Sequence, residues 1–157
     1  LKGDVVIAYG DILYKRYILH ELMASDAPIT VVVDGSRAFL EEGKKADRVK
    51  VSAPLPEGFD ESEYSLLGMS REIPDAETQG EWIGLARLRG EGTERFLNVF
   101  DEILASDGGD QLSLSAVFDR LAQQPGDSDG NSIRVIYVQR DWVDINSLAD
   151  VARGGAV

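Results

Sequence analysis

Residues 4–11 of the chain read DVVIAYGD, and this stretch decides the fold class. The run from Val5 to Tyr9 has no charged residue and no alternation of polar and apolar residues, which predicts a strand buried on both faces. Such strands are typical of parallel sheets covered by helices on both sides. Gly10 and Asp11 end the run, so we expect the strand to stop at a glycine followed by a carboxylate.

The segments that follow the first strand predict a β-α-β unit. Residues 13–24 place apolar side chains, among them Ile18 and Leu22, at helical spacing with charged residues between them. Pro28 ends this helix, because a proline disfavours helical geometry in the residue before it. Residues 29–33 read ITVVV and predict a second strand. Short connections between the three elements predict a right-handed crossover.

The rest of the chain continues the same alternation of strands and helices. Further strands are expected at residues 48–51, 64–69, 82–88 and 132–138. Residues 93–104 form the clearest amphipathic helix, and residues 114–121 form another. No internal repeat or domain boundary interrupts this order. We therefore expect residues 1–157 to form one α/β domain, with a Rossmann-like, mostly parallel sheet flanked by helices.

The composition excludes several kinds of site and partner. The 157 residues include 16 basic and 28 acidic residues, no cysteine and one histidine, for a formal net charge of −12. Such a charge repels nucleic acid and anionic membranes, and no apolar run approaches the roughly 20 residues that span a bilayer. A cation would be bound by carboxylates, amides or His20, because thiolates are absent. No signal peptide precedes the first strand, so a cytoplasmic location is expected.

Two aspartates follow predicted strands and are candidate ligands of Mg²⁺. Ligands bind beyond the carboxyl ends of strands in open α/β sheets, where Gly10 would let the backbone approach a ligand and Asp11 would offer hard oxygens. Asp144 follows the last strand, and two distant carboxylates at one end of a sheet can hold Mg²⁺ on a phosphate. Each residue also has a plainer explanation: Asp11 as a helix cap, and Asp144 as a cap or a surface turn.

Residues 80–85, GEWIGL, place a glutamate at the start of an apolar strand. Glu81 could accept hydrogen bonds from a hydroxyl or ammonium group of a small substrate. Glutamates at the exposed start of a strand are common, so the segment alone favours a surface position for Glu81.

These segments, in this order, resemble the nucleotidyltransferase family. It includes sugar-1-phosphate nucleotidyltransferases, phosphocholine cytidylyltransferases and the cytidylyltransferase domains linked to phosphoenolpyruvate mutase in phosphonate biosynthesis. In that family a strand ends in a Gly-Asp motif whose aspartate binds Mg²⁺, here Asp11. A late Trp-x-Asp-Ile-Asn motif supplies the second metal ligand, here Asp144 in residues 142–146. The strand that begins at Gly80 and Glu81 is similar to the one that contacts the acceptor.

The resemblance runs from Gly3 to about Ala152 and implies a nucleotide-diphospho-sugar transferase-like fold. It implies Mg²⁺-dependent transfer of CMP from CTP to a small phosphate- or phosphonate-bearing acceptor. Asp11 and Asp144 are then the catalytic metal ligands, and Gly10 is a nucleotide-binding position. The other two positions, Gly80 and Glu81, bind the acceptor. The GEWIGL strand and the absence of a sugar-binding signature favour the choline-phosphate and phosphonate branches.

One departure from the family pattern concerns the start of the chain. Family members begin with a strand and a glycine-rich loop containing an arginine, followed by a Pro-Lys pair, and these wrap the nucleotide phosphates. Only ten residues precede Asp11. We therefore expect the C-terminal portion of the fold, lacking that strand and loop and inactive alone. An incomplete sheet also predicts a homo-oligomer, or a partner chain that completes it.

Two other functions stay open from the sequence. The first is a non-catalytic nucleotidyltransferase-like module that serves oligomerisation or regulation. The second is an α/β phospho-acceptor or small-ligand domain modified at Asp11, which leaves the motif of residues 142–146 unexplained.

Overall fold

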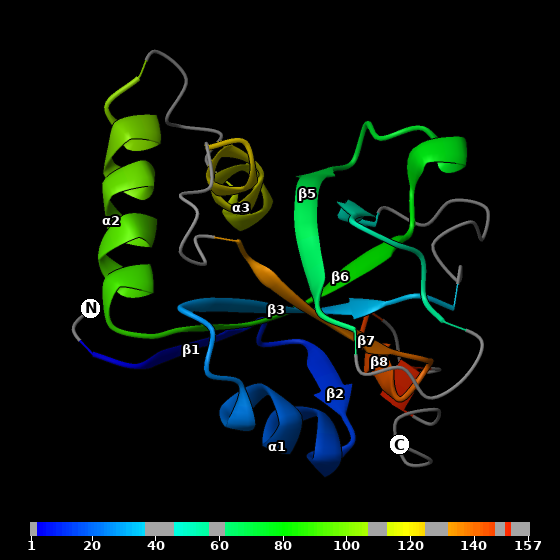
Figure 1. Ribbon diagram of the computed structural model, residues 1–157. Helices are drawn as coiled ribbons and strands as arrows, with labels where there is room; N and C mark the ends of the chain where they lie inside the picture. Colours follow the sequence, from blue (N-terminus) through cyan, green and yellow to red (C-terminus); the bar gives the residue numbers. More distant parts are fainter. Residues whose placement is uncertain are drawn as a thin grey trace.

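The computed structural model describes residues 3–36, 46–56, 62–106, 113–124, 132–146 and 150–151. The described residues form a six-stranded sheet, a two-stranded sheet and three α-helices (Figure 1). The strands are β1 (Val5–Ala8), β2 (Ile12–Tyr14), β3 (Ile29–Asp34), β4 (Arg48–Val51), β5 (Tyr64–Ser70), β6 (Gly80–Leu88), β7 (Arg134–Val138) and β8 (Trp142–Asp144). The helices are α1 (Arg16–Ala24), α2 (Glu91–Leu104) and α3 (Leu114–Ala122), with a 3₁₀ turn η2 (Asp75–Glu77).

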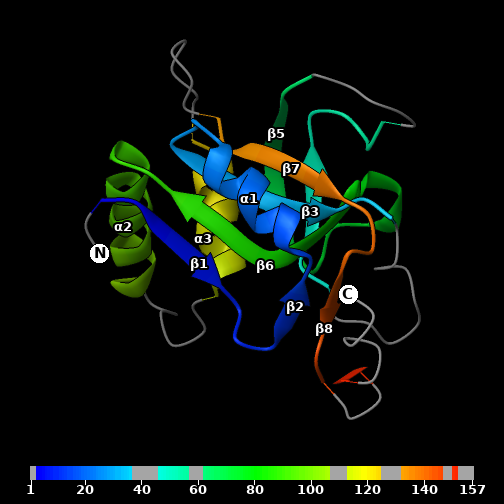
Figure 2. The ribbon, with the colours of Figure 1, turned by 90° about the horizontal axis from the view of Figure 1, so that it is seen from below.

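The large sheet separates two apolar layers. Helices α2 and α3 cover one face, and α1 lies on the other (Figure 2). The larger layer contains Phe96 of α2 and Phe118 of α3, while the smaller one contains Ile18 and Leu22 of α1. This arrangement confirms the α/β class and the amphipathic helices that the sequence predicts. None of the described helices is long and apolar enough to cross a membrane.

The direction of the strands differs from the prediction. The strand order is β1-β6-β3-β7-β5-β4, and β3–β7 is the one parallel pair among the described strands. The prediction of a Rossmann-like, mostly parallel sheet was therefore wrong. Strands β1 and β3 do run in the same direction, but β6 lies between them and is antiparallel to both. A continuous apolar run indicates burial on two faces and does not specify the direction of the neighbouring strand.

Strand β1 is the edge of the six-stranded sheet. Among the described strands of this sheet it alone has a single partner, because β4 at the far end also pairs with β6. Burial alternates along β1, and Val6 exposes 41% of its surface, although the sequence predicts burial on both faces. Natural edge strands are usually protected by charge, proline or a bulge. Since β1 has no charged residue, its edge can pair with a strand of another chain.

The first helix begins at Arg16 and not at Leu13 as predicted. The preceding residues form β2, which pairs with β8 near the other end of the chain. Short apolar segments cannot be assigned from periodicity when their partner is so distant in sequence. The N-cap position of α1 is Lys15, so Asp11 does not cap this helix. The alternative explanation of Asp11 as a helix cap is thereby removed.

Gly84 lies at a bulge of β6, where the register with β3 shifts between Val31 and Val33. Its φ is +81°, and an added Cβ would lie 2.2 Å from Cδ2 of Tyr9. We expect Gly84→Ala to lower the free energy of unfolding by about 3 kcal/mol, from backbone strain and overpacking together. Chemical denaturation measures this loss.

Gly90→Ala is the matched control for Gly84→Ala. Gly90 also has positive φ (+48°), but no heavy atom lies within 4 Å of the added Cβ. Its loss should therefore be about 1 kcal/mol, from backbone strain alone. Equal losses in the two variants would contradict the steric contribution at Gly84.

Candidate functional site

The β2–β8 ladder brings the two predicted metal ligands to one place. Ile12 lies opposite Asp144, and the N–H of Ile145 donates to the carbonyl oxygen of Asp11 at 2.7 Å. Asp11 and Asp144 therefore lie at the same end of one two-stranded ladder, although most of the sequence separates them. This proximity was expected from the sequence, whereas the ladder that creates it was not.

Asp144 is on the face of the ladder that is turned toward the main sheet. Residues directly opposite each other in an antiparallel pair share a face, as do alternate residues of one strand. Ile12, Tyr14 and Trp142 all pack against the apolar cluster beneath α1. Asp144, opposite Ile12 and two residues from Trp142, shares their face and is half-buried. On this same face, Nε1 of Trp142 donates to the Asp34 carboxylate at the carboxyl end of β3.

Gly10 and Asp11 occupy the turn between β1 and β2, and both are exposed. A Cβ added at Gly10 would meet no heavy atom within 4 Å, so packing among the described residues does not require a glycine there. Both residues are open to a ligand arriving at this end of the sheet.

Asp34 ends β3 and is a site residue to which the sequence analysis gave no role. It is 2% exposed, and each carboxylate oxygen accepts one hydrogen bond. Oδ1 accepts from the backbone N–H of Ser36 at 2.7 Å, and Oδ2 accepts from Nε1 of Trp142 at 2.8 Å. The buried Ser36 hydroxyl has no hydrogen-bond partner among the described residues. The position after a buried strand, which singled out Asp11, was also the available signal for Asp34.

Glu81 and Gly80 begin β6 beside the end of β3. Glu81 lies opposite Asp34 in register and is 2% exposed, which removes the alternative of a surface glutamate. A Cβ at Gly80 would lie 2.6 Å from the backbone oxygen of Asp34 and 2.6 Å from Cγ1 of Val33. The close approach of β3 and β6 therefore explains the glycine. Two buried carboxylate residues, Asp34 at the end of β3 and Glu81 at the start of β6, thus lie beside each other.

A second polar cluster lies around Asp47, which is 6% exposed. Its Oδ1 accepts from Nε of Arg71 at 2.9 Å, and its Oδ2 accepts from the Tyr9 hydroxyl at 3.5 Å. Burial and the nearby Asp47 raise the pKa of Tyr9 to about 12, and Asp11 acts in the same direction. Tyr9 is therefore protonated near neutral pH, and the structure does not make it a general base.

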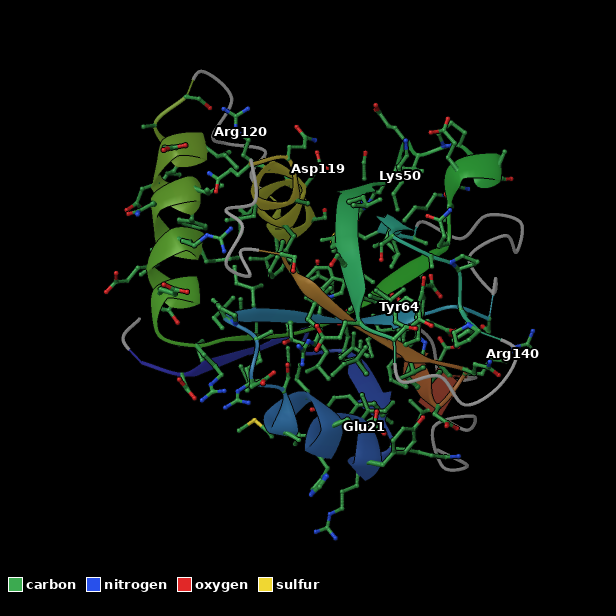
Figure 3. All side chains as sticks on the ribbon, in the orientation of Figure 1. Glu21, Lys50, Tyr64, Asp119, Arg120 and Arg140 are labelled. Carbon is green, nitrogen blue, oxygen red and sulfur yellow. The ribbon has the colours of Figure 1, made fainter. Side chains whose placement is uncertain are left out.

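The turn before β8 is attached to the start of α1. Nζ of Lys15 lies 2.6 Å from Oδ1 of Asp141, and the Tyr17 hydroxyl donates to Oδ2 at 2.7 Å. These hydrogen bonds, first that of Lys15 and then that of Tyr17, lower the pKa of the Asp141 carboxyl. The neighbouring Arg140 has a positive φ of 56° and lies at the periphery of the molecule (Figure 3). The sequence analysis did not identify this attachment.

The donor set fits Mg²⁺ only in combination with a substrate. No three His, Cys, Asp or Glu side chains of the described residues come together as a ligand group. The ladder brings the backbones of two carboxylate residues, Asp11 and Asp144, to one end. Mg²⁺ is usually held by one or two carboxylates and completes its coordination with water and substrate phosphates. As Mg²⁺ ligands these two residues would therefore need a substrate phosphate and water beside them.

A shallow depression of about 230 Å³ lies at the opposite end of β3, around Pro28 and Arg134. The Arg134 guanidinium is already paired with Asp26 at 2.8 Å and with Glu63. Its charge is thus neutralised locally, and none of the predicted site residues lines this depression. The candidate site is the carboxyl end of β3 with the β2–β8 ladder.

The chain shares its fold with solved nucleotidyltransferases. An inositol-1-phosphate CTP transferase from T. maritima is 15% identical with a TM-score of 0.62, over 96% of this chain and 52% of that one. A UTP-bound UGPase from Acinetobacter baumannii is 14% identical with a TM-score of 0.63, over 96% and 49%. An apo UDP-glucose pyrophosphorylase is 13% identical with a TM-score of 0.66, over 98% and 53%. The chain thus spans about half the length of these structures. No protein-family model and no curated protein sequence matches it.

Proposed function

We propose that this domain supplies the metal- and acceptor-binding part of a nucleotidyltransferase. The reaction is Mg²⁺-dependent transfer of CMP from CTP to a small acceptor that carries a phosphate or phosphonate. The single observation that supports the proposal is the β2–β8 ladder, in which Ile12 lies opposite Asp144 and the N–H of Ile145 donates to the carbonyl oxygen of Asp11. The shared fold is consistent with nucleotidyl transfer in general.

The chemistry asks for positioning and charge neutralisation, not for covalent help. An acceptor oxygen attacks the α-phosphorus in line, the bond from the α-phosphorus to the α,β-bridging oxygen breaks, and pyrophosphate leaves. Bound Mg²⁺ would neutralise the phosphate oxygens, and Asp11 and Asp144 would hold it. The acceptor phosphate is already ionised near neutral pH, so no general base is needed.

The buried carboxylate of Glu81 would orient the far end of the acceptor, an amine or a hydroxyl. Glu81 and Asp34 are both 2% exposed and lie opposite each other in register. A carboxylate forms charge-assisted hydrogen bonds with an amine, and it accepts hydrogen bonds from a hydroxyl. This acceptor end and the GEWIGL strand are our reasons for preferring the phosphocholine and phosphonate classes. A cytoplasmic location is part of the same proposal.

The test is a transfer assay on the full-length product of the gene. Protein is incubated with Mg²⁺, each of the four nucleoside triphosphates, and phosphocholine, 2-aminoethylphosphonate, inositol-1-phosphate or glucose-1-phosphate, and pyrophosphate release is followed. Release with CTP and an amine-bearing acceptor is the expected result. Because the matched structures are about twice as long, activity is proposed for the completed fold, and residues 1–157 alone should be inactive. No release with any pair would contradict the proposal.

A non-catalytic oligomerisation or regulatory module is the second candidate, and the free edge of β1 is the observation that favours it. An apolar edge pairs readily with another strand, so we propose that the chain forms a homo-oligomer or binds a partner chain that completes the sheet. Nucleotide binding without turnover, by a protein that self-associates, would favour this second function.

We expect Val6→Lys to weaken association of the purified chain. Val6 is 41% exposed on the edge strand, and a lysine there places a charge at the pairing surface. The apparent mass by light scattering should fall toward that of the 17.1 kDa monomer. Leu104→Lys is the control, because Leu104 is 54% exposed on α2, away from the edge. A wild-type chain that is already monomeric without a partner would rule out the homo-oligomer.

A further inference from the structure

The β8 strand, which carries Asp144, has little support of its own. Strand β8 has three residues, and so does its ladder partner β2. An isolated two-stranded ribbon is marginally stable at best, so side-chain attachments must fix its place. Two such attachments are present: Asp141 to Lys15 and Tyr17 at the outer turn, and Trp142 to Asp34 at the sheet.

The Trp142–Asp34 attachment lies on the face of β8 that also carries Asp144. Nε1 of Trp142 donates to Oδ2 of Asp34 at 2.8 Å, and the Asp34 carboxylate is 2% exposed. The other oxygen is occupied by the N–H of Ser36 at 2.7 Å, so the carboxylate has one orientation available. Trp142 and Asp144 are alternate residues of β8 and share a face. The Asp34–Trp142 hydrogen bond therefore fixes the position of β8, and with it the position of Asp144, relative to the end of β3.

We infer that Asp34 is a positioning residue for Asp144 and acts through the indole N–H of Trp142. The inference rests on the proposed function in one respect, namely that Asp144 binds Mg²⁺. The geometric part, that Asp34 holds β8 against the end of β3, stands independently of it. Groups that orient a metal ligand from behind commonly change metal affinity or activity by about 10- to 100-fold when they are lost.

The chain offers a matched pair of tryptophan substitutions to test this. Trp142→Phe keeps an aromatic ring on the apolar cluster and removes the donor to Asp34, together with part of the ring volume. Trp82→Phe is the control: Nε1 of Trp82 donates to the backbone oxygen of Leu85 at 3.0 Å, in the core and away from β8. Asp34→Asn is the partner variant. An amide has one acceptor oxygen and turns its NH₂ toward the second donor, so one of the two bonds is lost.

The first readout is hydrogen exchange in the full-length protein without nucleotide. The amide of Ile145, bonded to Asp11 at 2.7 Å, should exchange about tenfold faster in Trp142→Phe and Asp34→Asn. Trp82→Phe should leave it unchanged. Unaltered exchange at Ile145 in both Trp142→Phe and Asp34→Asn would overturn the inference.

The second readout is Mg²⁺ binding, followed by calorimetry in the presence of CTP. We expect the dissociation constant of Mg²⁺ to rise about 10- to 100-fold in Trp142→Phe and to be unaltered in Trp82→Phe. The double variant Asp34→Asn/Trp142→Phe should lose no more than Trp142→Phe alone, because without the indole donor Asp34 has no hydrogen bond to β8 through which to act. Additive losses would mean that the residues act separately, contradicting the inference. If the wild type binds no Mg²⁺, the proposed function fails, and exchange at Ile145 alone decides the positioning role.

Discussion

Replacing either Asp11 or Asp144 with asparagine is expected to lower the rate of CMP transfer by about 10³-fold at saturating substrates. Each substitution keeps the size of the side chain and removes one negative charge from the metal position. Charge neutralisation by a bound metal supplies several kcal/mol of transition-state stabilisation, and about 1.4 kcal/mol corresponds to a factor of ten. Asp11 is exposed and Asp144 is half-buried, so neither change should unfold the protein.

The measurement is single-turnover transfer at a series of Mg²⁺ concentrations, with a melting curve for each variant. Asp101→Asn is the control, because Asp101 is an exposed carboxylate on α2, on the opposite face of the sheet from α1. It should retain wild-type rates at every Mg²⁺ concentration. A variant at Asp11 or Asp144 that turns over at the wild-type rate would show that this carboxylate is no metal ligand.

The elements whose pattern is local were predictable from the sequence. Strand β4 matches the predicted residues 48–51, and α3 (Leu114–Ala122) exceeds its prediction by one residue. In both elements the apolar residues recur with a regular period that is visible within a few residues of sequence. Residues 13 and 14 of strand β2 were predicted as helix, because this short segment has no period of its own and gains its structure from β8. Strand direction was missed for a similar reason: the insertion of β6 between β1 and β3 is decided by long-range pairing.

Among the residues of the candidate site, too, those with a local sequence signal were predictable and the one defined by a long-range contact was not. Asp11 and Asp144 could be found because each follows an apolar segment in a short motif, and the structure places them on one ladder. Asp34 has no motif around it, and its importance comes from a hydrogen bond to Trp142, 108 residues further along the chain. Gly80 was assigned to the acceptor from the family resemblance, and that role stays a prediction, while strand packing already accounts for the glycine.

Arg87→Met is expected to lower the free energy of unfolding by about 3 kcal/mol, because it removes a buried cation from several acceptors at once. Arg87 is 7% exposed and is the last residue but one of β6. Its Nη1 donates to the carbonyl oxygens of Met23 at 2.5 Å and Ser25 at 2.9 Å, at the C-terminal end of α1. Its Nη2 lies 2.9 Å from Oδ2 of Asp4. A cation at this end also complements the helix dipole.

Arg89→Met is the matched control, since Arg89 contacts the same Ser25 carbonyl at 3.2 Å and the same Asp4 carboxylate at 3.4 Å. Its side chain is 39% exposed, so water can replace these contacts and the loss should be below about 1 kcal/mol. Urea denaturation of both variants measures the difference. Asp141, in the turn before β8, is bound by Lys15, which directly precedes α1, and by Tyr17, which lies in α1. Loosening α1 should therefore also release this turn. Equal losses for the two arginines would mean that Arg87 contributes through its charge alone, and that burial beneath α1 adds nothing.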